Sequence, residues 1–120
     1  MDNEILYLSH DNTIDLILKK EDANGDQVAL TNDEMDAITE ITATFGTIKI
    51  STLAANKDTG PIRWRQTGYD PGEIRLVLGG ETITADLYPK VPIIVYDADN
   101  TDGVVWALIP ISVKAEVEGT

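Results

Sequence analysis

Apolar and polar residues alternate along most of the chain with a period of two, which is the period of β-strands. Near the N-terminus, Ile14, Leu16 and Leu18 would share one face of a strand. In the segment 105–117 every second residue is apolar, from Val105 to Val117. Both segments predict strands with one apolar face turned toward a core and a second face turned outward.

Further segments have the same pattern, and turn residues separate them at short intervals. We expect strands at 39–45, 47–52 and 61–66, joined by loops. In all, the pattern predicts seven to nine short strands in a single domain that spans residues 1–120. This number of short strands favours an antiparallel all-β sandwich, with a jelly roll or a small barrel as the alternative.

The two glycines at 79–80 predict a β-hairpin with a two-residue loop. Such a loop would pair Leu76 with Ile83 and Ile74 with Ala85. The apolar residues of both strands would then lie on one face, as a half-buried hairpin requires.

A second hairpin is predicted around the sequence "DANGDQVAL". A three-residue loop at 23–25 would place Leu18 opposite Leu30, and it would put Gly25 where a left-handed residue is needed. A two-residue loop would instead place Leu30 opposite Lys19, on the wrong face. We therefore predict the three-residue loop, and an observed pair of Leu30 with Lys19 would contradict it.

Signals for helices are scarce. Thr31 precedes Glu34 by three residues, a spacing that resembles a capping box. Only Met35 and Ile38 could form an apolar stripe on a helix that starts there. We expect at most one short helix, near 31–38, as a link between two strands.

Composition narrows the possible functions. The 120 residues include no cysteine, so disulfides, thiol catalysis and cysteine-based zinc sites are excluded. The net charge of −12 opposes binding to nucleic acids and to anionic membranes, and it favours solubility or a basic partner. No apolar run approaches the roughly 20 residues of a membrane helix, and the N-terminus lacks the features of a signal peptide. We expect a protein made in the cytosol.

The most acidic short stretch is "DADNTDG", at 97–103. It does not fit the EF-hand spacing, because the twelfth position counted from Asp97 is Leu108, which offers no oxygen. A looser calcium site formed by Asp97, Asp99 and Asp102 is an alternative. The main interpretation is the polar tip of a hairpin, because Asp, Asn and Gly all tolerate turn conformations.

Catalytic motifs are not found. His10 is the only histidine, and its neighbour Ser9 would point to the opposite face of a strand, so the two do not form a nucleophile–base pair. No glycine-rich phosphate loop or nucleophile elbow is present. We predict that the chain is not an enzyme and uses no cofactor.

Trp64 lies between Arg63 and Arg65 in "PIRWRQ". If Trp64 points into the core, both arginines point outward together. If it is exposed, an indole flanked by two guanidinium groups would make an anchor for a protein partner. We take these three residues as the candidate protein contact.

Three stretches together resemble a known family: "HDNTIDLILKKEDANGDQVALT", "YDPGEIRL" and the closing "PISV". They look like the immunoglobulin-like domains of tailed-bacteriophage virion proteins, such as the N-terminal domain of baseplate upper proteins, or like head-decoration and tail accessory proteins. The resemblance covers about Leu8 to Val117. It implies an immunoglobulin-like sandwich with no catalytic residues.

The resemblance also implies a location and partners. We expect a structural protein of the virion, assembled in the cytoplasm of the bacterial host, that binds other virion subunits and forms a homo-oligomer. The alternative is a carbohydrate- or calcium-binding sandwich that uses the loop at 97–103.

Overall fold

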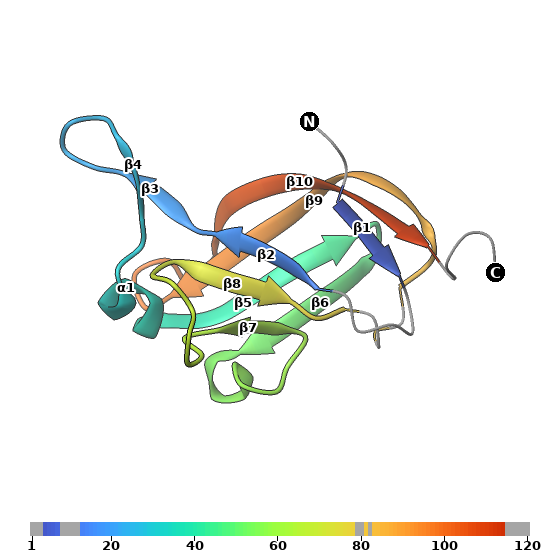
Figure 1. Cartoon of the computed structure of the whole chain (residues 1–120), viewed down its shortest axis with the longest axis horizontal. Coiled ribbons are helices and arrows are strands. Elements are labelled where there is room, and N and C mark those ends of the chain that lie inside the picture. The colour runs from blue at the N-terminus through green and yellow to red at the C-terminus, as the bar shows by residue number, and fades with distance from the viewer. Residues whose placement is uncertain (1–3, 8–12, 79–80, 82, 115–120) are drawn as a thin grey trace.

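The computed structural model describes residues 4–7, 13–78, 81 and 83–114. These residues form ten strands and two short helices (Figure 1). In chain order, the elements are β1 (Glu4–Tyr7), β2 (Ile14–Ile17), β3 (Lys19–Glu21), β4 (Gln27–Ala29), α1 (Asn32–Asp36), β5 (Ile38–Phe45), β6 (Ile48–Leu53), the 3₁₀ helix η1 (Ala54–Asn56), β7 (Ile62–Trp64), β8 (Glu73–Leu76), β9 (Asp86–Asp97) and β10 (Val104–Lys114). Neither helix in this part of the chain is long and apolar enough to cross a membrane.

Two sheets pack face to face. The larger sheet has the order β1-β10-β9-β5-β6 and the smaller has the order β2-β8-β7, while β3 and β4 form a separate hairpin. All pairs are antiparallel except β1 with β10. Strands β2, β5, β6, β7, β8, β9 and β10 take the places of strands B, C, C′, D, E, F and G of an immunoglobulin-like sandwich. The predicted fold class is therefore confirmed, although the described residues hold ten strands rather than seven to nine.

The inner faces of the two sheets form one core. Each sheet contributes aliphatic residues at alternate positions of its strands, as the period of two predicts. Core residues that are at most 2% exposed include Ile14, Ile41, Ala43, Phe45, Ile62, Trp64, Ile74, Leu76, Val91 and Ile93.

Tyr88 closes one end of this core, close to the start of β9. Its hydroxyl donates a hydrogen bond of 2.7 Å to the backbone oxygen of Thr84. Its ring stands edge-on to Phe45, with centroids 5.3 Å apart and an interplanar angle of 89°. A tyrosine that bonds back to the chain at the start of strand F is a hallmark of immunoglobulin-like domains.

The hairpin of β3 and β4 projects from the sandwich (Figure 1), and its predicted register is confirmed. Lys20 pairs with Val28, and the Leu30 N–H donates to the Leu18 oxygen at 2.9 Å. Gly25 has φ +85, the left-handed conformation that the three-residue loop requires.

The predicted helix and its cap are also confirmed. Thr31 precedes α1 and accepts a hydrogen bond from the Glu34 N–H, while the Glu34 side chain accepts one from the Thr31 N–H. Met35 of α1 and Ile38 are both buried as expected, although the helix ends at Asp36 and Ile38 is already the first residue of β5.

The predicted pairing of Leu76 with Ile83 and of Ile74 with Ala85 is wrong. Leu76 pairs with Ile14 of β2 and with Ile62 of β7, so both edges of β8 are occupied. The loop at 79–80 lies outside the described residues. Ile83 is buried but Ala85 is exposed, because this segment crosses from the smaller sheet to the larger one rather than returning beside β8.

The predicted apolar face of the last strand is only partly correct. Ile111 and Val113 are buried as expected, but Val105 is 56% exposed. The register between β10 and β9 shifts between Val105 and Ala107 and again between Ile109 and Ile111. The first shift places an extra residue in β10 and so changes which face Val105 occupies, whereas the second places the extra residue in β9 and leaves the alternation of β10 intact. The last predicted positions, at 115 and 117, lie outside the described residues.

Candidate functional site

The structure places Trp64 in the core, where it is 1% exposed. Its indole therefore has no surface to offer a partner, and the hypothesis of an exposed anchor is not supported for this residue. Arg63 and Arg65 lie at the surface, and each already has an internal partner. Arg63 Nε donates to the Gly60 oxygen at 3.0 Å.

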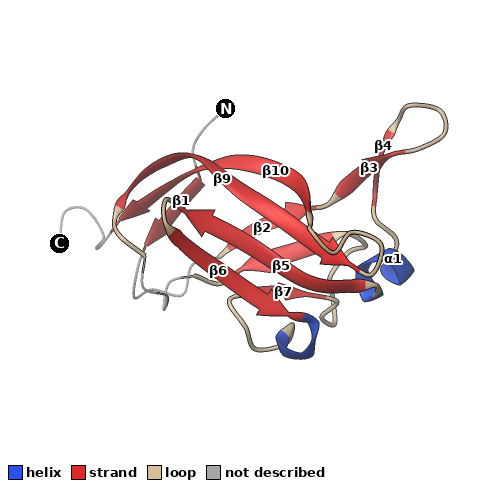
Figure 2. Cartoon of the chain, turned by 180° about the vertical axis from the view of Figure 1, so that it is seen from behind, coloured by secondary structure: helices blue, strands red, loops and turns tan. Residues whose placement is uncertain are grey.

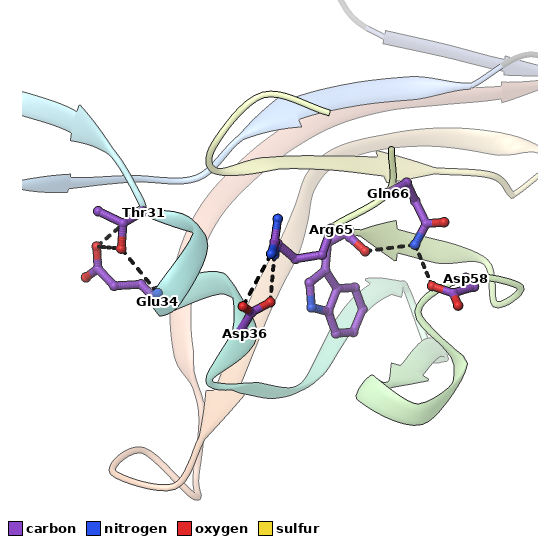
Figure 3. A network of polar contacts seen from close by, with 7 residues as sticks. Thr31, Glu34, Asp36, Asp58, Arg65 and Gln66 are labelled. Atoms are coloured by element: carbon purple, nitrogen blue, oxygen red, sulfur yellow. Dashed lines mark hydrogen bonds and ion pairs between the residues drawn. The ribbon is translucent and has the colours of Figure 1, made fainter. Parts of the chain in front are cut away.

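Arg65 joins the end of β7 to helix α1 (Figure 3). Its Nε lies 2.6 Å from Asp36 Oδ1, and its Nη2 lies 3.4 Å from Oδ2. This contact lowers the pKa of the Asp36 carboxyl. Beside it, Gln66 donates to Asp58 Oδ1 at 2.6 Å and so fastens the loop that follows η1. The predicted contact residues thus serve to hold α1 and this loop against the sandwich.

The loop at 97–103 is a tight turn between β9 and β10. Asp97 Oδ1 accepts hydrogen bonds from the Asp99 N–H and from the N–H and side-chain amide of Asn100, at 2.8–3.0 Å. In the part of the chain that the structure describes, no three acidic or histidine side chains gather as a group able to hold a metal ion. The geometry gives no support to a calcium site of Asp97, Asp99 and Asp102.

The outer faces of the two sheets differ in character. On the smaller sheet, Arg75 lies opposite both Asp15 and Arg63. Its guanidinium lies 2.7 Å from Asp15 Oδ1 and stacks over the Tyr69 ring at 4.9 Å. Asp15, and then Tyr69, raise the pKa of Arg75. This face is mostly polar: Arg75 is paired with Asp15, Arg63 bonds to a backbone oxygen, and Ile17 is an exposed aliphatic residue.

The outer face of the larger sheet is apolar where β9 and β10 form it. Figure 2 turns this face to the reader, and no other described strand or helix lies over these two strands. Val105 pairs with Ile94, Leu108 with Pro92 and Leu87 with Ser112, so their side chains share the outer face. Val105 and Leu108 are each 56% exposed and Leu87 is 54% exposed. We call the apolar members of this set the outer patch: Leu87, Pro92, Ile94, Val105 and Leu108.

Sequence reasoning missed this patch. Alternation along the last strand predicts Leu108 on the outward face, but it places Val105 inside. The stretch "VVWALIPI" is apolar at odd and even positions alike, and this was the signal in the sequence for an apolar outer face. A strand that is apolar on both faces in an antiparallel sheet either is covered by another layer or exposes one apolar face.

A pocket of about 330 Å³ lies at the C-terminal end of β9, where the base of the hairpin, α1 and the loop at 97–103 meet. Its rim includes an ion pair of 2.6 Å between Lys20 Nζ and Glu34 Oε2. Lys20, together with the Thr31 N–H, holds the pKa of the Glu34 carboxyl below its usual range.

Comparisons of the chain with protein-family models, with curated proteins and with solved structures find no match.

Proposed function

We propose that the chain is a non-enzymatic structural module that associates with copies of itself through the outer patch. The exposure of the patch is the observation that carries the proposal. Large aliphatic residues such as Val105 and Leu108 are 56% exposed, although they lie side by side on the flat of a sheet. Several exposed aliphatic residues on one face of a small domain are typical of a place where another molecule binds.

The location of the patch supports self-association in particular. It lies on the two longest strands, β9 and β10, which have 12 and 11 residues. Two copies related by a twofold axis could place these strands face to face, because an isologous interface uses the same patch twice. The outer face of the smaller sheet carries charged residues such as Asp15, Arg63 and Arg75, so we expect that face to remain in water.

The resemblance to phage immunoglobulin-like domains adds the biological setting. A virion subunit is present in many symmetry-related copies, and a self-complementary face suits such an assembly. We therefore propose a structural role in a phage particle, with other virion subunits as further partners. Detection of the protein by mass spectrometry in purified particles tests this part, and its absence from them would contradict it.

The association is tested by measuring mass as a function of concentration. Analytical ultracentrifugation of the wild type should give a mass that rises above the monomer value of 13.1 kDa as concentration increases. Leu108→Asp should remain at the monomer mass, because it introduces a charge into the patch. Ile17→Asp is the matched control, since Ile17 is 42% exposed on the smaller sheet and outside the patch.

Two results would contradict the proposal. One is a wild type that stays monomeric up to about 1 mM, which is the weakest self-association the assay is meant to detect. The other is equal loss of association in Leu108→Asp and Ile17→Asp. A rise in melting temperature with calcium or with a simple sugar would instead favour the ligand-binding alternative, because a ligand that binds only the folded state stabilises it.

A further inference from the structure

Apolar residues form part of the wall of the pocket at the base of the hairpin. Leu30, Ile38 and Val95, which are at most 4% exposed, line it together with the partly buried Trp106. Its volume of about 330 Å³ is near the lower end of the range for small-molecule sites, roughly 300–1,000 Å³. The size therefore suits one large side chain better than a nucleotide or an oligosaccharide.

The rim of the pocket is acidic. It carries one positive and three negative side chains: Lys20, Glu34, Asp97 and Asp99. Lys20 and Glu34 neutralise each other through their 2.6 Å contact. Among the described residues, neither Asp97 nor Asp99 has a salt-bridge partner, so two carboxylates remain unbalanced beside the indole of Trp106.

The turn leaves one of these carboxylate oxygens available. The three hydrogen bonds that Asp97 accepts within the loop all go to Oδ1, from Asp99 and Asn100. Oδ2 has no hydrogen-bond partner in the part of the chain that is described. The loop thus fixes the position of Asp97, which lines the pocket, and leaves its second carboxylate oxygen without a partner in the described part of the chain.

We propose that this pocket receives an arginine side chain from a basic segment of a partner protein. The aliphatic part of an arginine would lie against the apolar walls. Its planar guanidinium would stack on the ring of Trp106 and donate to Asp97 and Asp99. The net charge of −12 on the chain would steer a basic segment toward the site.

Two other occupants fit less well. A calcium ion needs six to eight oxygen ligands, and no group of three acidic side chains forms in the described residues. A neutral sugar could stack on Trp106, but it would leave the charges of Asp97 and Asp99 without a counterpart. The site is also separate from the outer patch, so it does not depend on self-association.

The test uses N-acetyl-arginine amide as the probe. Its binding is monitored through the indole and backbone resonances of the protein in NMR spectra. The probe should shift the Trp106 indole signal with a Kd of roughly 1–10 mM, the range expected for one side chain with a few polar contacts. N-acetyl-citrulline amide has nearly the same shape but no charge, and it should bind at least tenfold more weakly. Raising the salt from about 0.1 M to about 0.5 M should also weaken binding of the arginine probe.

Matched variants assign the effect to the pocket. The double variant Asp97→Asn with Asp99→Asn removes both charges, while the amide introduced at the first position keeps an oxygen for the turn; it should weaken binding at least tenfold. Asp102→Asn lies in the same loop but outside the pocket, so its affinity should equal that of the wild type. Backbone spectra of each variant confirm that the fold is retained.

The results also separate this inference from the proposed function. Monomeric Leu108→Asp should bind the arginine probe as the wild type does, because Leu108 does not line the pocket. The inference is overturned if the arginine probe gives no shift at about five times the upper end of the expected range, roughly 50 mM. It is also overturned if citrulline binds equally well, or if the double variant and Asp102→Asn lose the same affinity. Shifts produced by calcium or glucose, and not by the arginine probe, would overturn it as well.

Discussion

Two buried threonines allow the same substitution to be tested with opposite expected signs. Thr42 lies in the middle of β5 and is fully buried, and among the described residues its hydroxyl has no hydrogen-bond partner. Thr52 on β6 is 2% exposed, but its hydroxyl accepts a 3.0 Å hydrogen bond from the Ile62 N–H. Valine has the shape of threonine without the hydroxyl, and it is a good strand former.

The expected size of each effect follows from the cost of an unpaired buried polar group, about 1–3 kcal/mol. Thr42→Val removes such a group, so the free energy of unfolding should rise by about 1 kcal/mol. Thr52→Val creates one at the Ile62 N–H, so the free energy should fall by about 1–3 kcal/mol. The entropy of unfolding of a 120-residue domain is about 0.25 kcal/mol/K, so about 1 kcal/mol corresponds to about 4 °C in melting temperature.

Thermal unfolding followed by circular dichroism measures both changes. The measurement belongs in the Leu108→Asp background, because self-association would make the melting temperature depend on concentration. We expect Thr42→Val to melt about 4 °C higher and Thr52→Val about 4–12 °C lower. If Thr42→Val is neutral or destabilising while Thr52→Val behaves as expected, the hydroxyl of Thr42 has a partner and the reasoning is refuted.

Three further predictions concern Tyr88 near the start of β9, Gly103 in the turn before β10, and Glu34 in the helix cap. Tyr88→Phe should lower the free energy of unfolding by about 1 kcal/mol, through loss of the bond to Thr84, and urea unfolding as stable as the wild type would contradict this. Gly103→Ala should lower the melting temperature by at least about 4 °C, because Gly103 has φ +85 and a Cβ there would lie 2.5 Å from a neighbouring side-chain carbon. Equal melting temperatures would refute that expectation. Lys20 lowers the pKa of Glu34, so the stability from this pair is present above the ordinary pKa of 4.5 and is lost as the pH falls through the lower folded-state pKa. A carboxyl titration by NMR should show that pKa rising in Lys20→Met, and an unchanged pKa would count against the contact.

Elements specified by neighbouring residues could be predicted from the sequence. The register of the hairpin follows from Gly25 and from the need to place Leu18 and Leu30 on the same face. The helix follows from Thr31 and Glu34, which satisfy each other's backbone N–H groups. In both cases the residues that decide the structure lie within about a dozen positions of one another, so the pattern contains the information.

Pairings between distant segments could not be predicted in the same way. Leu76 meets Ile14 and Ile62, which are far from it in the chain, rather than the nearby Ile83. Alternation shows that Leu76 is buried but does not say which strands flank it. Two consecutive glycines predict a hairpin, in which the chain returns beside the strand it has just left. In a sandwich, however, the chain can also cross to the other sheet after a strand.

Both candidate sites arise from one irregularity that alternation cannot show. Val105 pairs with Ile94 and Ala107 pairs with Ile93, so Trp106 is an extra residue in β10 with no partner on β9. Without it, strict alternation from the buried Ile111 would place position 105 inside and position 106 outside. With it, Val105 joins the outer patch and Trp106 lines the pocket. Bulges commonly redirect a side chain toward a functional position, and here one inserted residue turns Val105 into the surface proposed for self-association and supplies the aromatic wall of the pocket proposed for an arginine.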